Sequence, residues 1–191
     1  MKKHLALLLI FLGTACAPVP DPTPTPTVIP APTQIPLSQL DIGSLLVVDG
    51  DLPEDVVPDT ITNENAVGSV EELDRADAVF TQYFLLEGGE GGGVSVFLFE
   101  SLGDVQAAFG KVSTMMNGPV AYYEVGEQAR IENFLIPIVA DVAPIEGSRL
   151  IFSRCHALAV IQFPRAEDLP AMERYGKRLD ERLQTLVCGE S

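Results

Sequence analysis

The sequence predicts an α+β fold: an antiparallel β-sheet of hairpins packed against two main helices, in a single domain spanning residues 37–191. Runs rich in β-branched and aromatic residues occur in pairs separated by turn residues, which is typical of hairpins. Two other segments repeat their apolar residues every three or four positions, which is typical of helices that bury one face. No internal repeat is visible.

The first hairpin is expected from Val79–Leu86 and Val94–Glu100. The segment between them, Glu87–Gly93, contains five glycines. It lacks the Lys-Ser/Thr pair of a phosphate-binding loop, and Glu90 would repel a phosphate. We therefore interpret the whole segment as the hairpin connection.

Two helical segments are expected in this half of the domain. Ser69–Glu72 has the spacing of a capping box and predicts a brief helix through about Ala78. Ser101–Asp104 opens a longer helix, which Asn117–Pro119 ends. One face of that longer helix carries four apolar residues: Val105, Phe109, Val112 and Met116.

More strands are expected at Val120–Val125 and Ala129–Phe134. Arg149–Ser153 and Ala157–Phe163 form either a second hairpin or one continuous bent strand. A long terminal helix follows, with Asp168 as its cap and its apolar residues on one side. These residues are Leu169, Met172, Tyr175, Leu179, Leu183 and Leu186.

Residues 1–15 have the pattern of a signal peptide: two lysines give a positive start, and the apolar run Leu5–Leu12 is too short to span a membrane. Small residues then lead directly into Cys16. This arrangement resembles the lipobox of bacterial lipoproteins, in which the cysteine carries acyl chains such as palmitate and becomes the new N-terminus. Gly13 departs from that pattern, because the family usually has leucine three residues before the cysteine. The alternative is an ordinary secretory signal with an incidental cysteine.

Residues 16–36 are expected to be the lipidated cysteine and a Pro/Thr-rich stalk. Proline at every second or third position excludes a helix and favours an extended polyproline II spacer. Twenty such residues reach roughly 60 Å at about 3.1 Å each. A proline-rich ligand for another protein is the alternative, but no basic residues flank the segment.

With Cys16 assigned to lipidation, Cys155 and Cys188 remain, and an exported domain favours a disulfide between them. A strand from Cys155 to Phe163 rises about 26 Å. A helix from Pro170 to Cys188 returns about 27 Å, so an antiparallel packing would bring both sulfurs to the same end.

The net charge of −15 becomes about −17 when the two lysines of the signal peptide are removed. Such an excess repels phosphate backbones, so we expect no nucleic-acid partner. Solubility is the plainer interpretation of the charge. The absence of tryptophan also disfavours a sugar-stacking lectin surface.

No residue set in the sequence indicates a reaction, a cofactor or a metal. His156 is the only histidine left after the signal peptide, which excludes a histidine-based zinc site, and no Gly-x-Ser-x-Gly motif accompanies it. The alternative chemistry at the cysteines, a reactive Cys155 thiol beside His156, is disfavoured because neighbouring residues on a strand point to opposite faces. The acidic residues of the turn after residue 48 could coordinate calcium, but their spacing is not that of an EF-hand. They are Asp49, Asp51, Glu54 and Asp55.

Three stretches of the domain give a family resemblance: Leu45–Pro53, with a Leu-rich segment before a Leu-Pro turn; Val94–Phe109, a strand feeding an Ala/Phe helix; and Arg154–Val160, which contains a cysteine before the terminal helix. In this order they resemble the extracellular sensor domains and sensor-like lipoproteins of actinobacteria, over most of residues 40–188. That family commonly has two disulfides and a tryptophan, whereas this chain has at most one disulfide and no tryptophan. The resemblance implies an α+β binding or sensing module without catalysis.

We therefore expect a monomeric, non-catalytic binding or sensor-like module, lipid-anchored to the bacterial membrane outside the cytoplasm. Its partner would be a small molecule or another envelope protein. The alternatives are a carboxylate-dependent cell-envelope hydrolase and a purely structural envelope protein. A binding module should show an apolar groove, whereas a hydrolase should show two or more carboxylates converging in it.

Overall fold

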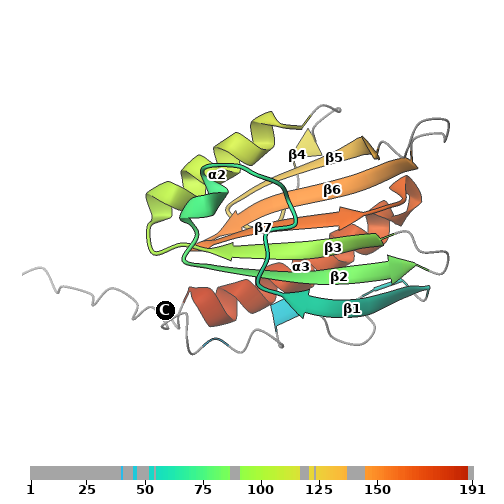
Figure 1. The fold of residues 1–191 in the computed structure, drawn as a ribbon, viewed down its shortest axis with the longest axis horizontal. Coiled ribbons are helices and arrows are strands. Elements are labelled where there is room, and N and C mark those ends of the chain that lie inside the picture. The colour runs from blue at the N-terminus through green and yellow to red at the C-terminus, as the bar shows by residue number, and fades with distance from the viewer. Residues whose placement is uncertain are drawn as a thin grey trace, which may run out of the picture. The chain divides into compact units, whose positions relative to one another are not determined.

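The computed structural model describes residues 40, 45–46, 52–53, 55–86, 91–116, 121–122, 124–136 and 145–188, all within one compact unit, residues 31–191. It confirms the predicted α+β class, with a seven-stranded antiparallel sheet and two main helices (Figure 1). The strand order across the sheet is β1-β2-β3-β7-β6-β5-β4. The strands are β1 (Val56–Thr62), β2 (Ala78–Leu86), β3 (Gly91–Leu98), β4 (Ala121–Tyr122), β5 (Gln128–Ile136), β6 (Ile145–Arg154) and β7 (Ala157–Phe163).

Both expected hairpins are present, but β3 begins at Gly91 instead of Val94, and β6 begins at Ile145 instead of Arg149. β2 and β3 pair from Ala78↔Leu98 to Leu85↔Gly91, so Gly91–Gly93 belong to a strand rather than to the connection. β6 and β7 form a hairpin, not one bent strand, and their last pair is Arg154↔Ala157. The brief helix expected through Ala78 is only a 3-10 turn, η2 (Leu73–Arg75), because β2 already begins at Ala78.

Each face of the sheet packs against one of the two main helices. Helix α3 (Leu169–Val187) passes behind the sheet in Figure 1 and packs on β6 and β7. Helix α2 (Leu102–Thr114) packs on the opposite face, again on β6 and β7. All four residues of the predicted α2 face are buried, and so are Met172, Tyr175, Leu179 and Leu183 of the predicted α3 face.

The two helix starts differ in how they are capped. At α2 the backbone N–H of Gly103 donates to the Ser101 Oγ (3.2 Å), as the capping pattern predicts. At α3 Asp168 is the N-cap residue, as predicted, but its side chain makes no capping hydrogen bond. Its carboxylate instead accepts from Arg165 at Nε (2.7 Å) and Nη2 (3.1 Å), and a charge-assisted pair outcompetes a single backbone donor.

A disulfide and a partly buried ion pair attach α3 to the β6–β7 hairpin. The structure bonds Cys155, in the hairpin turn, to Cys188, the C-cap residue of α3, with their Cα atoms 5.6 Å apart. About two turns back along the helix, Asp180 accepts from Arg154 at both Nε and Nη2 (2.6 Å each). These hydrogen bonds raise the pKa of the Arg154 guanidinium.

Arg165 links the start of α3 to the start of β1. Besides Asp168, its guanidinium contacts Asp55, donating from Nη1 (2.7 Å) and Nη2 (3.2 Å) to the two carboxylate oxygens. The hydrogen bond from Arg165 lowers the pKa of Asp55. In the part of the chain that the structure describes, no helix is long and apolar enough to cross a membrane.

Replacing both Cys155 and Cys188 by serine should lower the free energy of unfolding by about 3 to 4 kcal/mol, because a 33-residue loop is no longer closed in the unfolded chain. Urea denaturation of wild type and double variant measures the loss. Dithiothreitol should destabilise the wild type by the same amount and leave the variant unchanged. A loss below about 1 kcal/mol would contradict the loop-closure argument.

Asp55→Asn should lower stability at pH 6 and have a smaller effect at pH 3. The folded-state pKa of Asp55 is depressed below 3.8, so its contribution is complete above that pH and is lost as the pH falls through the depressed value. Urea midpoints at both pH values measure this. Asp74→Asn, at an exposed carboxylate on η2, is the control and should leave the urea midpoint unchanged at either pH. If Asp55→Asn lowered the urea midpoint equally at both pH values, the stabilising role of the ionised Asp55 would be contradicted.

Candidate functional site

The face of the sheet that α2 covers changes character along β3. Under α2 the strand contributes Phe97, and Phe99 follows directly after it; both are completely buried. Towards the other end of the strand, the same face carries Ser95, Gly93 and Gly91, spaced two residues apart. The apolar core under α2 therefore gives way to a part of the sheet surface with small or absent side chains.

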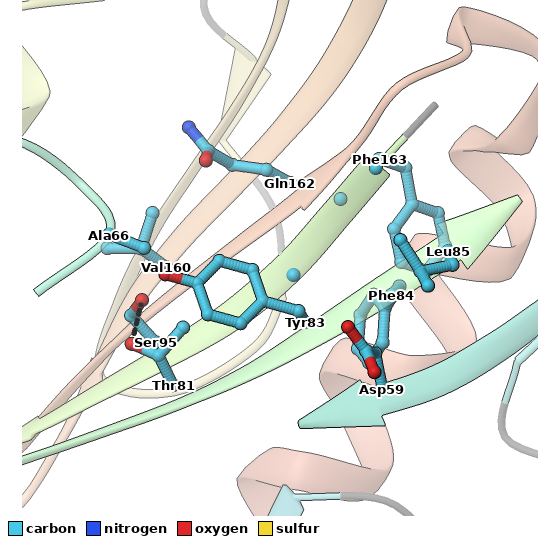
Figure 2. A pocket seen from close by; sticks show the side chains of 13 residues that line it. Asp59, Ala66, Thr81, Tyr83, Phe84, Leu85, Ser95, Val160, Gln162 and Phe163 are labelled. Atoms are coloured by element: carbon cyan, nitrogen blue, oxygen red, sulfur yellow. Dashed lines mark hydrogen bonds between the residues drawn. The ribbon is translucent and has the colours of Figure 1, made fainter. Parts of the chain in front are cut away.

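A pocket of about 430 Å³ lies over these small residues (Figure 2). Its volume falls within the range of about 300 to 1,000 Å³ that is usual for ligand sites. Strands β2, β3 and β7 form most of it, and Ala66 borders it from the segment between β1 and β2. The lining residues are Asp59, Ala66, Thr81, Tyr83, Phe84, Leu85, Gly91, Gly92, Gly93, Ser95, Val160, Gln162 and Phe163.

Gly93 forms the floor between two larger side chains. The strand register pairs it with Tyr83 on one side and Gln162 on the other. A Cβ atom at this position would lie 2.8 Å from the backbone oxygen of Gln82, closer than real contacts allow. Glycine is therefore required by the close approach of β2, and its missing side chain leaves the space between Tyr83 and Gln162 open.

Two buried hydroxyl groups lie at the α2 end of the pocket. Thr81 Oγ1 donates to the backbone oxygen of Glu64 (2.7 Å) and lies 2.8 Å from Ser95 Oγ (Figure 2). Since the hydroxyl hydrogen of Thr81 is used on Glu64, Ser95 is the donor in the contact between the two hydroxyls. Both hydroxyl hydrogens are thus engaged, and the lone pairs of Ser95 remain as acceptors.

A row of polar side chains continues from the pocket across β7, β6 and β5. The register places Gln162 opposite Arg149, and Arg149 opposite Glu132. The Arg149 Nη1 lies 3.4 Å from the Glu132 Oε1, and the Glu132 side chain is only 1% exposed. Burial lowers the pKa of the Arg149 guanidinium, and the charge of Glu132 opposes that shift.

Gln162 joins this ion pair to the pocket. With its amide turned over relative to Figure 2, Gln162 Oε1 accepts from Arg149 at Nε (2.9 Å) and Nη2 (2.8 Å). The guanidinium has only donors, so the amide oxygen must be the atom that faces it. Glu132 and Arg149 thereby hold a side chain that itself lines the pocket.

The chemistry of the lining is apolar and aromatic, with few charges. Phe84 and Phe163 contribute to it from the α3 side of the sheet, where their rings stack edge to face with centroids 5.8 Å apart. Of the described lining residues, Asp59 alone carries a carboxylate, and it is exposed. The arrangement can hold an apolar body and a few polar atoms, and it offers a single acid.

The residues singled out in the sequence lie elsewhere. Cys155 and Cys188 are brought together, but at the end of β7 opposite to Gln162. His156, beside Cys155, lies in the turn with its Nδ1 3.0 Å from the backbone oxygen of Phe99. Cys16 lies outside the described residues.

For the calcium hypothesis, Asp49, Asp51 and Glu54 also lie outside the described residues. Asp55 is described, and its carboxylate is held by Arg165. No group of three or more metal-ligating side chains is found among the residues with described positions.

Sequence reasoning missed the pocket itself. The available signal was the glycine run, which was interpreted wholly as a loop although Gly91–Gly93 begin a strand. The register that places Gln162 beside these glycines joins segments far apart in the chain. No protein-family model, curated protein or solved structure matches the chain.

Arg149→Met should lower the free energy of unfolding by about 2 to 4 kcal/mol, because it removes the charge that faces the buried carboxylate of Glu132. Chemical denaturation measures the loss. Adding Glu132→Gln should recover part of it, since no unpaired charge is then left in the sheet. Arg174→Met, on the exposed side of α3, is the matched control and should change stability by less than about 0.5 kcal/mol. Equal losses in the two arginine variants would contradict this role of the pair.

Proposed function

We propose that this protein is a non-catalytic binding module that takes a small, uncharged ligand in the pocket over Gly93. The observation that carries the proposal is the pocket's composition: aromatic and aliphatic walls, an open glycine floor and a few fixed polar groups. Such a combination is typical of small-molecule sites, in which apolar surface supplies affinity and a few polar atoms supply orientation.

The same composition disfavours the two alternatives. A carboxylate-dependent hydrolase needs two carboxyl groups facing the same substrate, and Asp59 is the single carboxylate among the described lining residues. A purely structural protein would be expected to fill the space over Gly93, because the open space between Tyr83 and Gln162 loses packing contacts that would stabilise the fold. A binding module accounts for both features.

The location belongs to the same proposal and rests on the sequence. A lipid on Cys16 would anchor the chain outside the cytoplasm, and the Pro/Thr-rich stalk would hold the domain clear of the membrane. The Cys155–Cys188 disulfide supports this location, because such bonds persist in oxidising compartments. Mass spectrometry of protein from its native membrane tests the anchor: an acyl chain on Cys16 is expected, and an unmodified residue 16 would overturn it.

Ala66→Trp should block the pocket, because Ala66 is exposed at its border and does not belong to the sheet. In 1H–15N spectra of residues 17–191, we expect acetophenone, phenol or α-methylstyrene to shift the amide signals of Gly91–Gly93, and the variant to abolish those shifts. Ser69→Trp, in the same segment but outside the lining, is the control and should bind as the wild type does. Shifts that are absent from the wild type, or unchanged in Ala66→Trp, would overturn the proposed site.

A further inference from the structure

The two ends of the Gln162 amide differ in what they recognise. The oxygen accepts hydrogen bonds and the nitrogen donates two, so the end that faces the pocket selects which ligand groups can bind. A side-chain amide without a fixed partner can present either end. In this protein a residue on the neighbouring strand β6 determines which end of the Gln162 amide faces the pocket.

Arg149 determines the orientation of the amide. Its Nε and Nη2 both donate to Gln162 Oε1, at 2.9 and 2.8 Å, and this two-point contact fixes the plane of the amide as well as its direction. The guanidinium is itself held from the other side by Glu132, 3.4 Å away. Turning the amide over would place two sets of N–H donors against each other, so the orientation is strongly preferred.

With the oxygen on Arg149, the Gln162 Nε2 group faces the other way, towards the space that Ala66 and Tyr83 border (Figure 2). The buried hydroxyls at the α2 end have both used their hydrogens, Thr81 on Glu64 and Ser95 on Thr81. Among the described lining side chains, the remaining donors are the Tyr83 hydroxyl, whose hydrogen can rotate, and Gln162 Nε2, whose direction Arg149 fixes.

We propose that the pocket selects ligands bearing a carbonyl group next to an apolar body, with the carbonyl oxygen accepting from Gln162 Nε2. In this proposal, which rests on the proposed function, Arg149 is a positioning residue: it touches no ligand and acts by fixing the amide. Glu132 has the same role one strand further away, through Arg149.

A pair of isosteric probes tests the selection. Acetophenone and α-methylstyrene have the same shape, but the first carries C=O where the second carries C=CH2. Binding to residues 17–191 is measured by titration of the Gly91–Gly93 amide signals. Acetophenone should bind about tenfold more tightly, because the hydrocarbon has no oxygen that can accept a hydrogen bond from Gln162 Nε2.

Gln162→Glu is the first variant, since it keeps the size of the side chain and its contact with Arg149 but replaces the donor with an oxygen. The preference for acetophenone should vanish while α-methylstyrene binds as before. Arg149→Met is the second variant, and it frees the amide to turn, so the ratio of the two affinities should fall towards one. Arg174→Met, the surface control, should keep the wild-type ratio.

The ratio of the affinities for acetophenone and α-methylstyrene shows whether Arg149 orients the Gln162 amide or only stabilises the fold. If Arg149 served packing alone, Arg149→Met would weaken both probes equally and leave the ratio at about ten, which would overturn its role. Equal affinities of the two probes in the wild type would overturn the carbonyl selection but leave the pocket as a binding site. Shifts by neither probe would overturn the proposed function as well.

Discussion

The register of the antiparallel sheet is the constraint on which the candidate site depends. It aligns Glu132, Arg149, Gln162, Gly93 and Tyr83 on five adjacent strands, from β5 to β2, on one face. A slip of one residue in any of these pairings would turn a side chain of the row to the α3 side. The register that buries the core therefore also places the Glu132–Arg149 ion pair, the Gln162 amide and Gly93 side by side on one face.

The scaffold keeps this register through contacts made away from the pocket. Helix α3 is held to the sheet by the Cys155–Cys188 bond and by the ion pair between Asp180 and Arg154. A hydrogen bond from Tyr175 also ties α3 to the backbone of Leu46, which precedes the sheet in the chain. Helix α2 covers only the apolar half of the other face. Since α2 and the segment between β1 and β2 leave Gly91–Gly93 uncovered, the site occupies a surface that the rigid layers support from behind.

Local sequence patterns predicted the elements well and the site poorly. Helical spacing identified both buried helix faces, and paired β-rich runs identified both hairpins, because these signals lie within a few adjacent residues. Asp168 was expected to cap α3, but Arg165, three residues earlier, binds its carboxylate. The same guanidinium also binds Asp55, 110 residues away, and local spacing does not contain this long-range contact. The glycine run appeared as a loop for the same reason. Only the pairing of Gly93 with Gln162 shows that these glycines open a pocket.

The orientation of the Gln162 amide determines what the pocket can recognise, and hydrogen-bond scalar coupling measures it directly. A long-range correlation experiment on 13C,15N-labelled protein should show coupling from the Nε of Arg149 to the Cδ of Gln162, because that N–H donates to Oε1. We expect this correlation in the wild type and its loss in the Gln162→Met variant. Coupling instead from the Gln162 Nε2 to a protein carbonyl carbon, with none from Arg149, would contradict it.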